Sequence, residues 1–407
     1  MSPASRQSAH YPNRPFGLRG GGAFLMPQSE VHNCAVTAVI PTRNRAGRVA
    51  RLLDSLAEVR TKQLSWEVVV VDNGSTDGTA ETVRAAAGRV PAPLRYISEP
   101  EPGLHACRHR GAKEARGEVI AYLDDDTQVH REWLRGAEPV LAGLAGAVVC
   151  RILPQWEAPV PSWLEDLVST GVYGPLTLLD LGGEQREVEV SFVWGAGFFV
   201  RRSLVFELGG FHPDSMPAGL LRFRGDGEAG LMRKFEAAGH HAWYDPSSVV
   251  EHAVSAERMT HAYLRERFYR QGISESFTEL REELHLRAGL VPEAEPFERS
   301  PATNDALRAG GPSGLLRLAR RRMDAGYRRG RNWVSSSLAA SRRSRLRFDE
   351  DMGAAFLRGR DYHRRATQAD AGVRAWVRQP HYMGVSLAGF CSSAGPDDLE
   401  DTERTKS

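Results

Sequence analysis

Short apolar runs alternate with helical patterns over the first third of the chain. Four runs have the length and composition of buried strands: Val36–Ile40, which Pro41 should end, Val68–Val71, Leu94–Ile97 and Val119–Leu123. Apolar positions recur at helical spacing between them, in segments 49–59, 79 onward and 105–115. Repeated strand–helix units predict an α/β fold: a doubly wound, mostly parallel, Rossmann-like sheet with helices on both faces.

The later part of the chain predicts further strands and helices. Strand character returns at 188–200, and helical spacing is clear at 228–238 and from about 257 to 272. We predict the following organisation from composition and pattern: a disordered N-terminal arm (1–33), a catalytic domain (34–275) with halves 34–130 and 131–275, a basic helical C-terminal extension (276–393) and a disordered acidic tail (394–407).

Composition places the chain among ordinary globular proteins. It has 407 residues, 41% of them hydrophobic and 26% charged, with a formal net charge of +2, so no global charge predicts nucleic-acid binding. Its four cysteines form no CxxC pair, which argues against a zinc knuckle or a disulfide framework. No apolar run approaches the roughly 20 residues needed to span a bilayer. We therefore expect a cytoplasmic protein.

Three polar turns follow predicted strands: Pro41–Arg45, Asp72–Gly78 and Asp124–Asp126. In a doubly wound sheet, ligands bind beyond the carboxyl ends of the strands, so we expect the three turns to form one site. Three successive carboxylates repel one another as they crowd and lose hydration. A hard cation such as Mg²⁺ or Mn²⁺ offsets both costs. The alternative for the triplet alone is a solvated acidic turn.

These turns resemble the motifs of the family 2 glycosyltransferases, which have the GT-A fold. The resemblance runs from about Thr37 to His252 and more weakly to about Gly272. Four stretches carry it, in this order: Val39-Ile40-Pro41-Thr42-Arg43-Asn44, then Val70-Val71-Asp72-Asn73-Gly74-Ser75-Thr76-Asp77-Gly78-Thr79, then Leu123-Asp124-Asp125-Asp126 (similar to the family's DxD element), and Trp194-Gly195-Ala196-Gly197-Phe198. The resemblance implies an inverting, hexosyltransferase-type enzyme that uses a nucleotide-sugar donor.

The resemblance also implies roles for residues of the 34–130 half, which would bind the nucleotide. Asp72 would accept the imide N–H of a uracil or thymine ring, with Asn73 beside it, and Pro41 and Arg43 would flank the base. This favours UDP-linked or dTDP-linked donors. Asp124 and Asp125 would contact the ribose and approach the metal.

The metal position implied by the resemblance is Asp126, with His252 completing the shell of an Mn²⁺ or Mg²⁺ ion. A strand-end histidine with no ligand role is the alternative for His252. Arg108 matches an arginine that could reach the donor diphosphate, because its planar fork suits phosphate oxygens. The alternative for Arg108 is a surface position on an amphipathic helix.

An inverting transfer needs a general base near the acceptor hydroxyl. The family supplies it from an acidic pair before a helix, and the spacing to Leu231 aligns Glu228 with that base. Asp226 is the competitor, and both acids could instead cap the helix. Trp194 and Gly195 would offer an aromatic platform and close backbone approach to the acceptor, or Trp194 could be a core residue.

The C-terminal third holds an arginine-rich segment, 315–348, with eleven arginines against one acid, Asp324. Such a segment could lie on an anionic membrane, near a carbohydrate, lipid-linked or small-molecule acceptor, or could simply be a solvated face.

Two other functions stay open at this point. A nucleotidyltransferase of similar architecture would usually have a Gly-rich loop after the first strand, which 41–44 is not. A catalytically inactive glycan-binding or nucleotide-binding relative is disfavoured by the intact triplet and Glu228.

Overall fold

A computed structural model describes most of the chain. The described residues are 34–60, 64–169, 171–287 and 339–391. The predicted arm (1–33), the first part of the arginine-rich segment (315–338) and the predicted tail (394–407) lie outside them.

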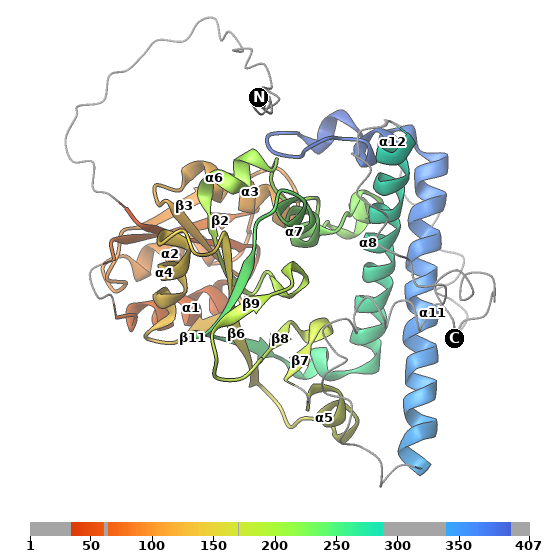
Figure 1. Ribbon diagram of the computed structural model, residues 1–407, viewed down its shortest axis with the longest axis horizontal. Coiled ribbons are helices and arrows are strands. Elements are labelled where there is room, and N and C mark those ends of the chain that lie inside the picture. The colour runs from red at the N-terminus through yellow and green to blue at the C-terminus, as the bar shows by residue number, and fades with distance from the viewer. Residues whose placement is uncertain (1–33, 61–63, 170, 288–338, 392–407) are drawn as a thin grey trace, which may run out of the picture. The chain divides into compact units, whose positions relative to one another are not determined.

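A single mixed sheet forms the centre of the fold, and helices flank it (Figure 1). Its main path runs β3-β2-β1-β4-β10-β6-β11-β5. The strands on this path are β1 Val36–Thr42, β2 Trp66–Asp72, β3 Leu94–Ser98, β4 Val119–Leu123, β5 Thr127–Val129, β6 Ala147–Trp156, β10 Gly197–Arg201 and β11 Ala242–Val254. Short strands β7 Val172–Tyr173, β8 Leu178–Leu179 and β9 Arg186–Val188 pair at its margins.

The first four strands are parallel to one another, as the alternating pattern predicts. Strand β10 then lies antiparallel to both β4 and β6, so the sheet is mixed beyond β4. Pro41 does not end β1, because the pairing of β1 with β4 stops at Val39 and the missing N–H of Pro41 is not needed there. The expected α/β fold class is confirmed.

Helices of the first half pack their apolar faces on the sheet. Helix α1 (Ala46–Ala57) buries the helically spaced Val49, Leu52, Leu53 and Leu56. Helices α2 (Thr79–Ala86) and α3 (Leu104–Glu114) follow β2 and β3. In α3, Gly111 lies so close to Val39 of β1 that any side chain there would collide with it. The small residue therefore sets the close approach of α3 to the sheet.

The second half contains shorter elements between the strands. They are η1 Trp133–Ala137, α4 Glu138–Leu141, α5 Ser162–Val168, η2 Gly174–Leu176, η3 Val190–Phe192, α6 Arg202–Glu207, η4 Ala218–Phe223, α7 Gly227–Ala237 and η5 Ala256–Met259. Helix α7 forms where helical spacing predicts it. The predicted strand over 188–200 is broken by η3, so that β10 begins only at Gly197.

The C-terminal part consists of α8 (His261–Arg287), α11 (Ala339–Ala369), α12 (Ala371–Val377) and η6 (Leu387–Gly389). Helices α8 and α11 lie side by side (Figure 1). Gly272 faces the backbone of α11 and Gly359 faces the backbone of α8, at distances that leave no room for a Cβ. Helix α8 runs unbroken through residue 275, where the sequence predicts a domain boundary.

A second apolar cluster attaches these helices to the sheet domain. Trp376 of α12 packs against Phe223 of η4 and donates its indole N–H to the Phe223 carbonyl at 2.9 Å. Arg281 of α8 donates to the carbonyls of Val377 and Gln379 at 2.7 and 2.6 Å. The helical extension is therefore joined to the sheet domain through both packing and buried hydrogen bonds.

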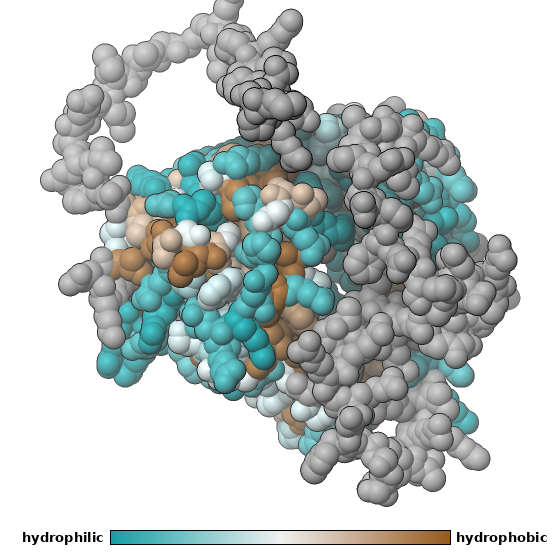
Figure 2. Space-filling view, in the orientation of Figure 1, coloured by the Kyte–Doolittle hydropathy of each residue, from teal (hydrophilic) through white to brown (hydrophobic). Residues whose placement is uncertain are grey.

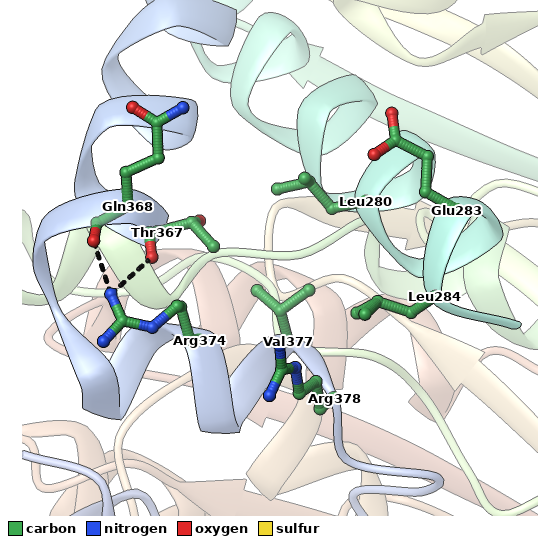
Figure 3. Close-up of a pocket in the computed structure, with 8 residues that line it drawn as sticks. All are labelled: Leu280, Glu283, Leu284, Thr367, Gln368, Arg374, Val377 and Arg378. Carbon is green, nitrogen blue, oxygen red and sulfur yellow. Dashed lines mark hydrogen bonds between the residues drawn. The ribbon is translucent and has the colours of Figure 1, made fainter. Parts of the chain in front are cut away.

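A cavity of about 180 Å³ lies between α8, α11 and α12 (Figure 3). Its residues are Leu280, Glu283, Leu284, Thr367, Gln368, Arg374, Val377 and Arg378. Arg374 closes the end of α11 by donating to the carbonyls of Thr367 and Gln368 (Figure 3). The Arg374 guanidinium at this cavity is therefore already engaged by the carbonyls that end α11.

Among the coloured residues in Figure 2, hydrophilic ones predominate, with smaller hydrophobic areas between them. Within the described ranges, no helix combines the length and the apolar character that crossing a bilayer requires.

Candidate functional site

The turn after β2 docks on the turn after β1. The Ser75 hydroxyl accepts from the Asn44 N–H at 2.7 Å, and the Asn44 side-chain carbonyl accepts from the Thr76 N–H at 2.7 Å. Asp77 accepts from the N–H of Ala46, the first residue of α1. The two polar turns predicted to share a site therefore form one hydrogen-bonded surface at the carboxyl edge of the sheet.

Asp72 ends β2 and is buried, with 1% of its surface exposed. Its two carboxylate oxygens accept hydrogen bonds from the Ser75 N–H at 2.8 Å and the Tyr96 hydroxyl at 2.5 Å. Burial, together with the hydrogen bond and charge of Asp72, raises the pKa of Tyr96 to about 12. Each carboxylate oxygen can accept a further hydrogen bond, so a ligand N–H can still bind here.

Asn73 fixes the loop that leads into α3. Its amide nitrogen donates to the carbonyls of Glu99 and Glu101 at 2.8 and 2.6 Å, and its oxygen accepts from the Gly103 N–H at 3.1 Å. The Glu101 carboxylate in turn accepts from the Ser386 hydroxyl and the Leu387 N–H. Asn73 therefore links the turn after β2, through the loop before α3, to the C-terminal segment near η6.

The other two residues predicted to flank the base lie at the end of β1. Pro41 pairs in register with Val71 of β2, and Arg43 is exposed on the turn after the strand. Thr42 between them donates its hydroxyl to Asp125 at 2.8 Å. The first turn and the aspartate triplet are thus in direct contact.

The three aspartates after β4 have different partners. Asp124 lies 3.4 Å from the Arg108 guanidinium, Asp125 lies 3.0 Å from Arg45, and Asp126 lies 3.1 Å from both Arg45 and Arg258. Burial raises the pKa of Asp124 and raises that of Asp125 to about 7. Burial also acts to raise the pKa of Asp126, but His252 and the two arginines outweigh it and hold that pKa well below its usual range.

Asp126 and His252 come together as the sequence resemblance implies. The Nε2 atom of His252 lies 3.2 Å from Asp126 Oδ1, and only 2% of His252 is exposed. The Nδ1 atom lies 2.9 Å from the Leu176 carbonyl, which can only accept, so Nδ1 carries a proton that it donates. In the neutral imidazole this leaves a lone pair on Nε2, which is the tautomer of a metal-ligating histidine whose second nitrogen is anchored.

The carboxylate of Asp126 and the imidazole of His252 fit a divalent cation, although they supply only two protein ligands. Asp126 offers a carboxylate and His252 an imidazole nitrogen, both suited to Mn²⁺. Across the described ranges, no group of three or more His, Cys, Asp or Glu side chains is arranged to hold a metal ion. A cation at this position would therefore complete its shell with oxygens from water or from a bound diphosphate.

Arg108 is buried, with 1% of its surface exposed, which excludes the surface alternative. Its guanidinium nitrogens lie 3.0 Å from Glu228 and 3.4 Å from Asp124. The Gly195 N–H also donates to Glu228 at 3.3 Å. A Cβ at residue 195 would collide with the Arg108 guanidinium, so a glycine is required for this approach.

Asp226 and Glu228 have opposite surroundings. The side chain of Asp226 is 4% exposed and that of Glu228 is 24% exposed. Asp226 accepts from His212 at 2.6 Å and from Thr278 at 2.7 Å, and it also pairs with Arg233. Burial acts to raise the pKa of Asp226, yet the charges and hydrogen bonds of these partners lower it. Asp226 therefore ties α7 to α8, whereas Glu228 is reachable from the site.

Trp194 is partly buried, so it is neither a fully buried core residue nor a fully exposed platform for an acceptor. Its indole N–H donates to the Ser191 carbonyl at 2.8 Å, and its ring lies 6.4 Å from that of Phe192. A Cβ on Gly174 would lie 3.7 Å from the Trp194 ring. The short helix η2, whose Leu176 carbonyl binds His252, therefore begins next to the Trp194 ring.

Sequence reasoning missed four residues of this site: Thr42, Arg45, Tyr96 and Arg258. Arg45 lies at the end of the first polar turn, and its position near Arg43 was the only signal available. Tyr96 and Arg258 reach the site through strand pairing and through η5, respectively. Their contacts depend on tertiary structure, which no local pattern carries.

A family model and several known proteins match parts of this chain. Residues 37–209 match the model of Glycosyl transferase family 2. Glycosyltransferase AglE of Haloferax volcanii is 31% identical over 108 residues, which cover 26% of this chain and 36% of that relative. The pre-mycofactocin glycosyltransferase of Mycobacterium tuberculosis is 29% identical over 240 residues, which cover 56% of this chain and 45% of the relative. The chain thus spans less than half the length of either protein.

The fold as a whole is similar to a solved structure. The mannosyltransferase PcManGT from Pyrobaculum calidifontis, in complex with GDP-Man and Mn²⁺, superposes with a TM-score of 0.50 and 21% identity. The match covers 82% of this chain and 88% of that one. Residues 37–209 of this chain therefore match Glycosyl transferase family 2, and the chain has the GT-A fold.

Proposed function

We propose that this protein transfers a sugar from a nucleotide-sugar donor to an acceptor hydroxyl, with inversion at the anomeric carbon. One observation carries the proposal: the buried Arg108 guanidinium lies between Asp124, at the end of β4, and Glu228, at the start of α7. A carboxylate of the nucleotide half and one of the acceptor half thus share one cation. A sugar that passes from a donor to an acceptor has to lie where the donor-binding half and the acceptor-binding half meet.

The donor side supports a uridine or thymidine nucleotide. Asp72 is buried at the strand end and retains acceptor capacity for the imide N–H of the base. Thr42 and Arg45 hold Asp125, and Asn73 holds the loop before α3. These residues would orient the nucleoside without taking part in bond formation.

Asp126 and His252 would hold an Mn²⁺ or Mg²⁺ ion. When bound there, the ion would act as a Lewis acid that neutralises the charge developing on the leaving diphosphate. The Leu176 carbonyl would keep the His252 ring in the required tautomer. Arg108, fixed between Glu228 and Asp124, would add positive charge that a diphosphate oxygen can pair with.

Glu228 is the proposed general base. Its carboxylate would accept the proton of the acceptor hydroxyl while the hydroxyl oxygen forms a bond to the anomeric carbon. The bond from that carbon to the diphosphate oxygen breaks at the same time, and its electron pair leaves with the nucleoside diphosphate. The N–H of Gly195 and the guanidinium of Arg108 both orient Glu228 toward this position.

The acceptor side consists of Trp194 and the adjacent hairpin. The partly exposed indole ring can stack on the apolar face of a sugar, which supports a carbohydrate, a glycolipid or a glycosylated small molecule as the acceptor. The pre-mycofactocin and AglE relatives carry glycosyltransferase names, which agrees with this proposal at the level of reaction type.

The test measures release of nucleoside diphosphate from UDP-, dTDP- and GDP-sugars with Mn²⁺, and again with excess chelator. We expect release from a UDP- or dTDP-sugar that requires the metal. Glu228→Gln should lower kcat by about 100-fold or more, since general bases contribute at least that much.

The matched control is Glu236→Gln, an exposed acid on the same helix, which should leave turnover unchanged. Donor turnover that is indifferent to chelation would contradict the metal assignment. Wild-type turnover in Glu228→Gln would contradict the base assignment.

A further inference from the structure

An arginine of the chain lies where Asp126 and His252 converge. One nitrogen of Arg258, Nη1, lies 3.1 Å from Asp126 Oδ2, 3.1 Å from His252 Nε2 and 3.2 Å from the Ala253 carbonyl. This nitrogen has two hydrogens but three acceptors around it. A carboxylate oxygen, an imidazole nitrogen and a carbonyl oxygen are also donor atoms that a divalent cation accepts. The guanidinium therefore occupies the position proposed for the metal.

The remainder of the Arg258 side chain is anchored outside this position. Its Nε donates to the Tyr263 hydroxyl at 3.1 Å, and its guanidinium carbon lies 5.6 Å from the centre of the Tyr263 ring. Arg258 belongs to the short helix η5, and Tyr263 to the first turn of α8. Because Nε and Nη1 belong to one rigid planar group, Tyr263 helps to hold the guanidinium beside Asp126, and the guanidinium must give up this hydrogen bond to move away.

Charge makes the two occupants mutually exclusive. Asp126 already pairs with Arg45 and Arg258, and Arg258 is the more enclosed of the two, with 17% of its side chain exposed against 49%. A doubly charged ion placed against both guanidinium groups would be strongly repelled. The repulsion falls only when a guanidinium moves away or when anionic oxygens arrive.

We propose that Arg258 holds the cation position in the donor-free enzyme and leaves it when a nucleoside diphosphate binds. The inference rests on the proposed function, because it takes Asp126 and His252 as the metal ligands. Diphosphate oxygens would accept hydrogen bonds from the displaced guanidinium, whose fork matches their geometry. Metal and nucleotide then strengthen each other's binding by the same factor.

The test measures Mn²⁺ affinity of the full chain without nucleotide, from the EPR signal of free Mn²⁺. If Arg258 occupies the position about nine tenths of the time, Arg258→Met should bind Mn²⁺ about tenfold more tightly than wild type. The control is Arg95→Met, which removes an arginine paired with Glu67 and Glu114 away from the site. It should leave Mn²⁺ affinity unchanged.

A second arm adds UDP at saturation. Wild type should then gain Mn²⁺ affinity, whereas Arg258→Met should gain less, because its position is already free. Tyr263→Phe removes the anchor of Nε and keeps the charge. It should change Mn²⁺ affinity in the same direction as Arg258→Met but by a smaller factor.

Two results separate the possible failures. Unchanged or weaker Mn²⁺ binding in Arg258→Met, with binding still lost in Asp126→Asn, overturns the role of Arg258 and leaves the metal site standing. Mn²⁺ binding in wild type that survives Asp126→Asn, with and without UDP, removes the metal site itself and the inference with it.

Discussion

Asp226 and Glu228 show how strongly the surroundings of a carboxylate decide its use. Asp226 is enclosed by His212, Arg233 and Thr278, so its charge already holds α7 against α8. Removing the charge from such a buried network leaves its partners uncompensated. The two acids, separated by one residue, therefore predict different phenotypes.

Asp226→Asn should lower the free energy of unfolding by about 3 kcal/mol, since breaking a buried ion pair costs that much. Its kcat, measured well below the melting temperature, should stay within about tenfold of wild type, less than the loss of a general base. Urea unfolding and steady-state kinetics on the same preparation check both. A stable Asp226→Asn protein without turnover would instead make Asp226 the base.

Gly195 offers a second prediction at this scale. A methyl group there would push the Arg108 guanidinium away from Glu228 and Asp124. Because a misplacement of about 1 Å in a reacting site costs about 100-fold in rate, Gly195→Ala should lose about that factor in kcat. Gly219→Ala, where the added methyl meets open space, is the control. Equal rates for the two variants would show that the position of Arg108 does not matter.

At the level of elements, the apolar runs predict β1 to β4 to within about two residues, because buried strands are marked by continuous branched apolar residues. The bounds of the predicted helix at 257–272 agree less well with the structure than the bounds of these strands do. The structure has η5 and then the much longer α8. The face of α8 is determined by Ser274, Thr278 and Arg281, polar residues whose partners lie elsewhere in the chain.

Only those residues of the site that lie at the ends of strands could be predicted from the sequence. Asp72, Asp126 and His252 each come after an apolar run, and the structure brings the last two together. Arg45 is marked only as the last residue of the polar turn after the first strand, and Arg258 carries no signal of its own, because arginines are frequent in this chain. Their roles depend on which carboxylate the fold places beside them.

The pairing of α8 and α11 contains a buried histidine that should make it sensitive to acid. His363 of α11 lies 3.0 Å from the Ser276 hydroxyl and beside the Phe277 ring, both of α8. Burial, followed by the charge of Arg364, lowers the pKa of His363 from 6.5 to about 4. The nearby Glu279 is already paired with Arg360 and Arg364.

The His363 imidazole therefore binds a proton more readily in the unfolded chain than in the folded one. The contribution of His363 to the free energy of unfolding is fully present above about pH 6.5. It is lost as the pH falls toward about 4, which lowers that free energy by about 3 kcal/mol. Denaturant unfolding of wild type and His363→Gln across this range measures the difference, since other buried histidines titrate in both proteins. Parallel stability profiles for the two would exclude His363 as a source of acid sensitivity.

For the whole molecule, the arginine-rich segment leaves two alternatives to be separated by experiment: attachment to an anionic membrane, or a solvated face. Each arginine near an anionic surface contributes about 1 kcal/mol. Replacing Arg320, Arg321 and Arg322 by Gln in the full chain should therefore sharply reduce sedimentation with vesicles that contain anionic lipid. Vesicles of neutral lipid give the baseline. Equal partitioning of both proteins would leave the segment as a solvated face.

The Glu101 carboxylate, held by Ser386 and Leu387, joins positions almost three hundred residues apart in the chain. The family match ends at residue 209, yet this clasp and the base candidate both depend on residues beyond that boundary. A shortened protein cut to the family boundary would therefore lose both the proposed base Glu228 and the contact of Glu101 with the C-terminal segment. Anyone producing a minimal active fragment should keep the chain to residue 391, and should place tags or fusions beyond that point.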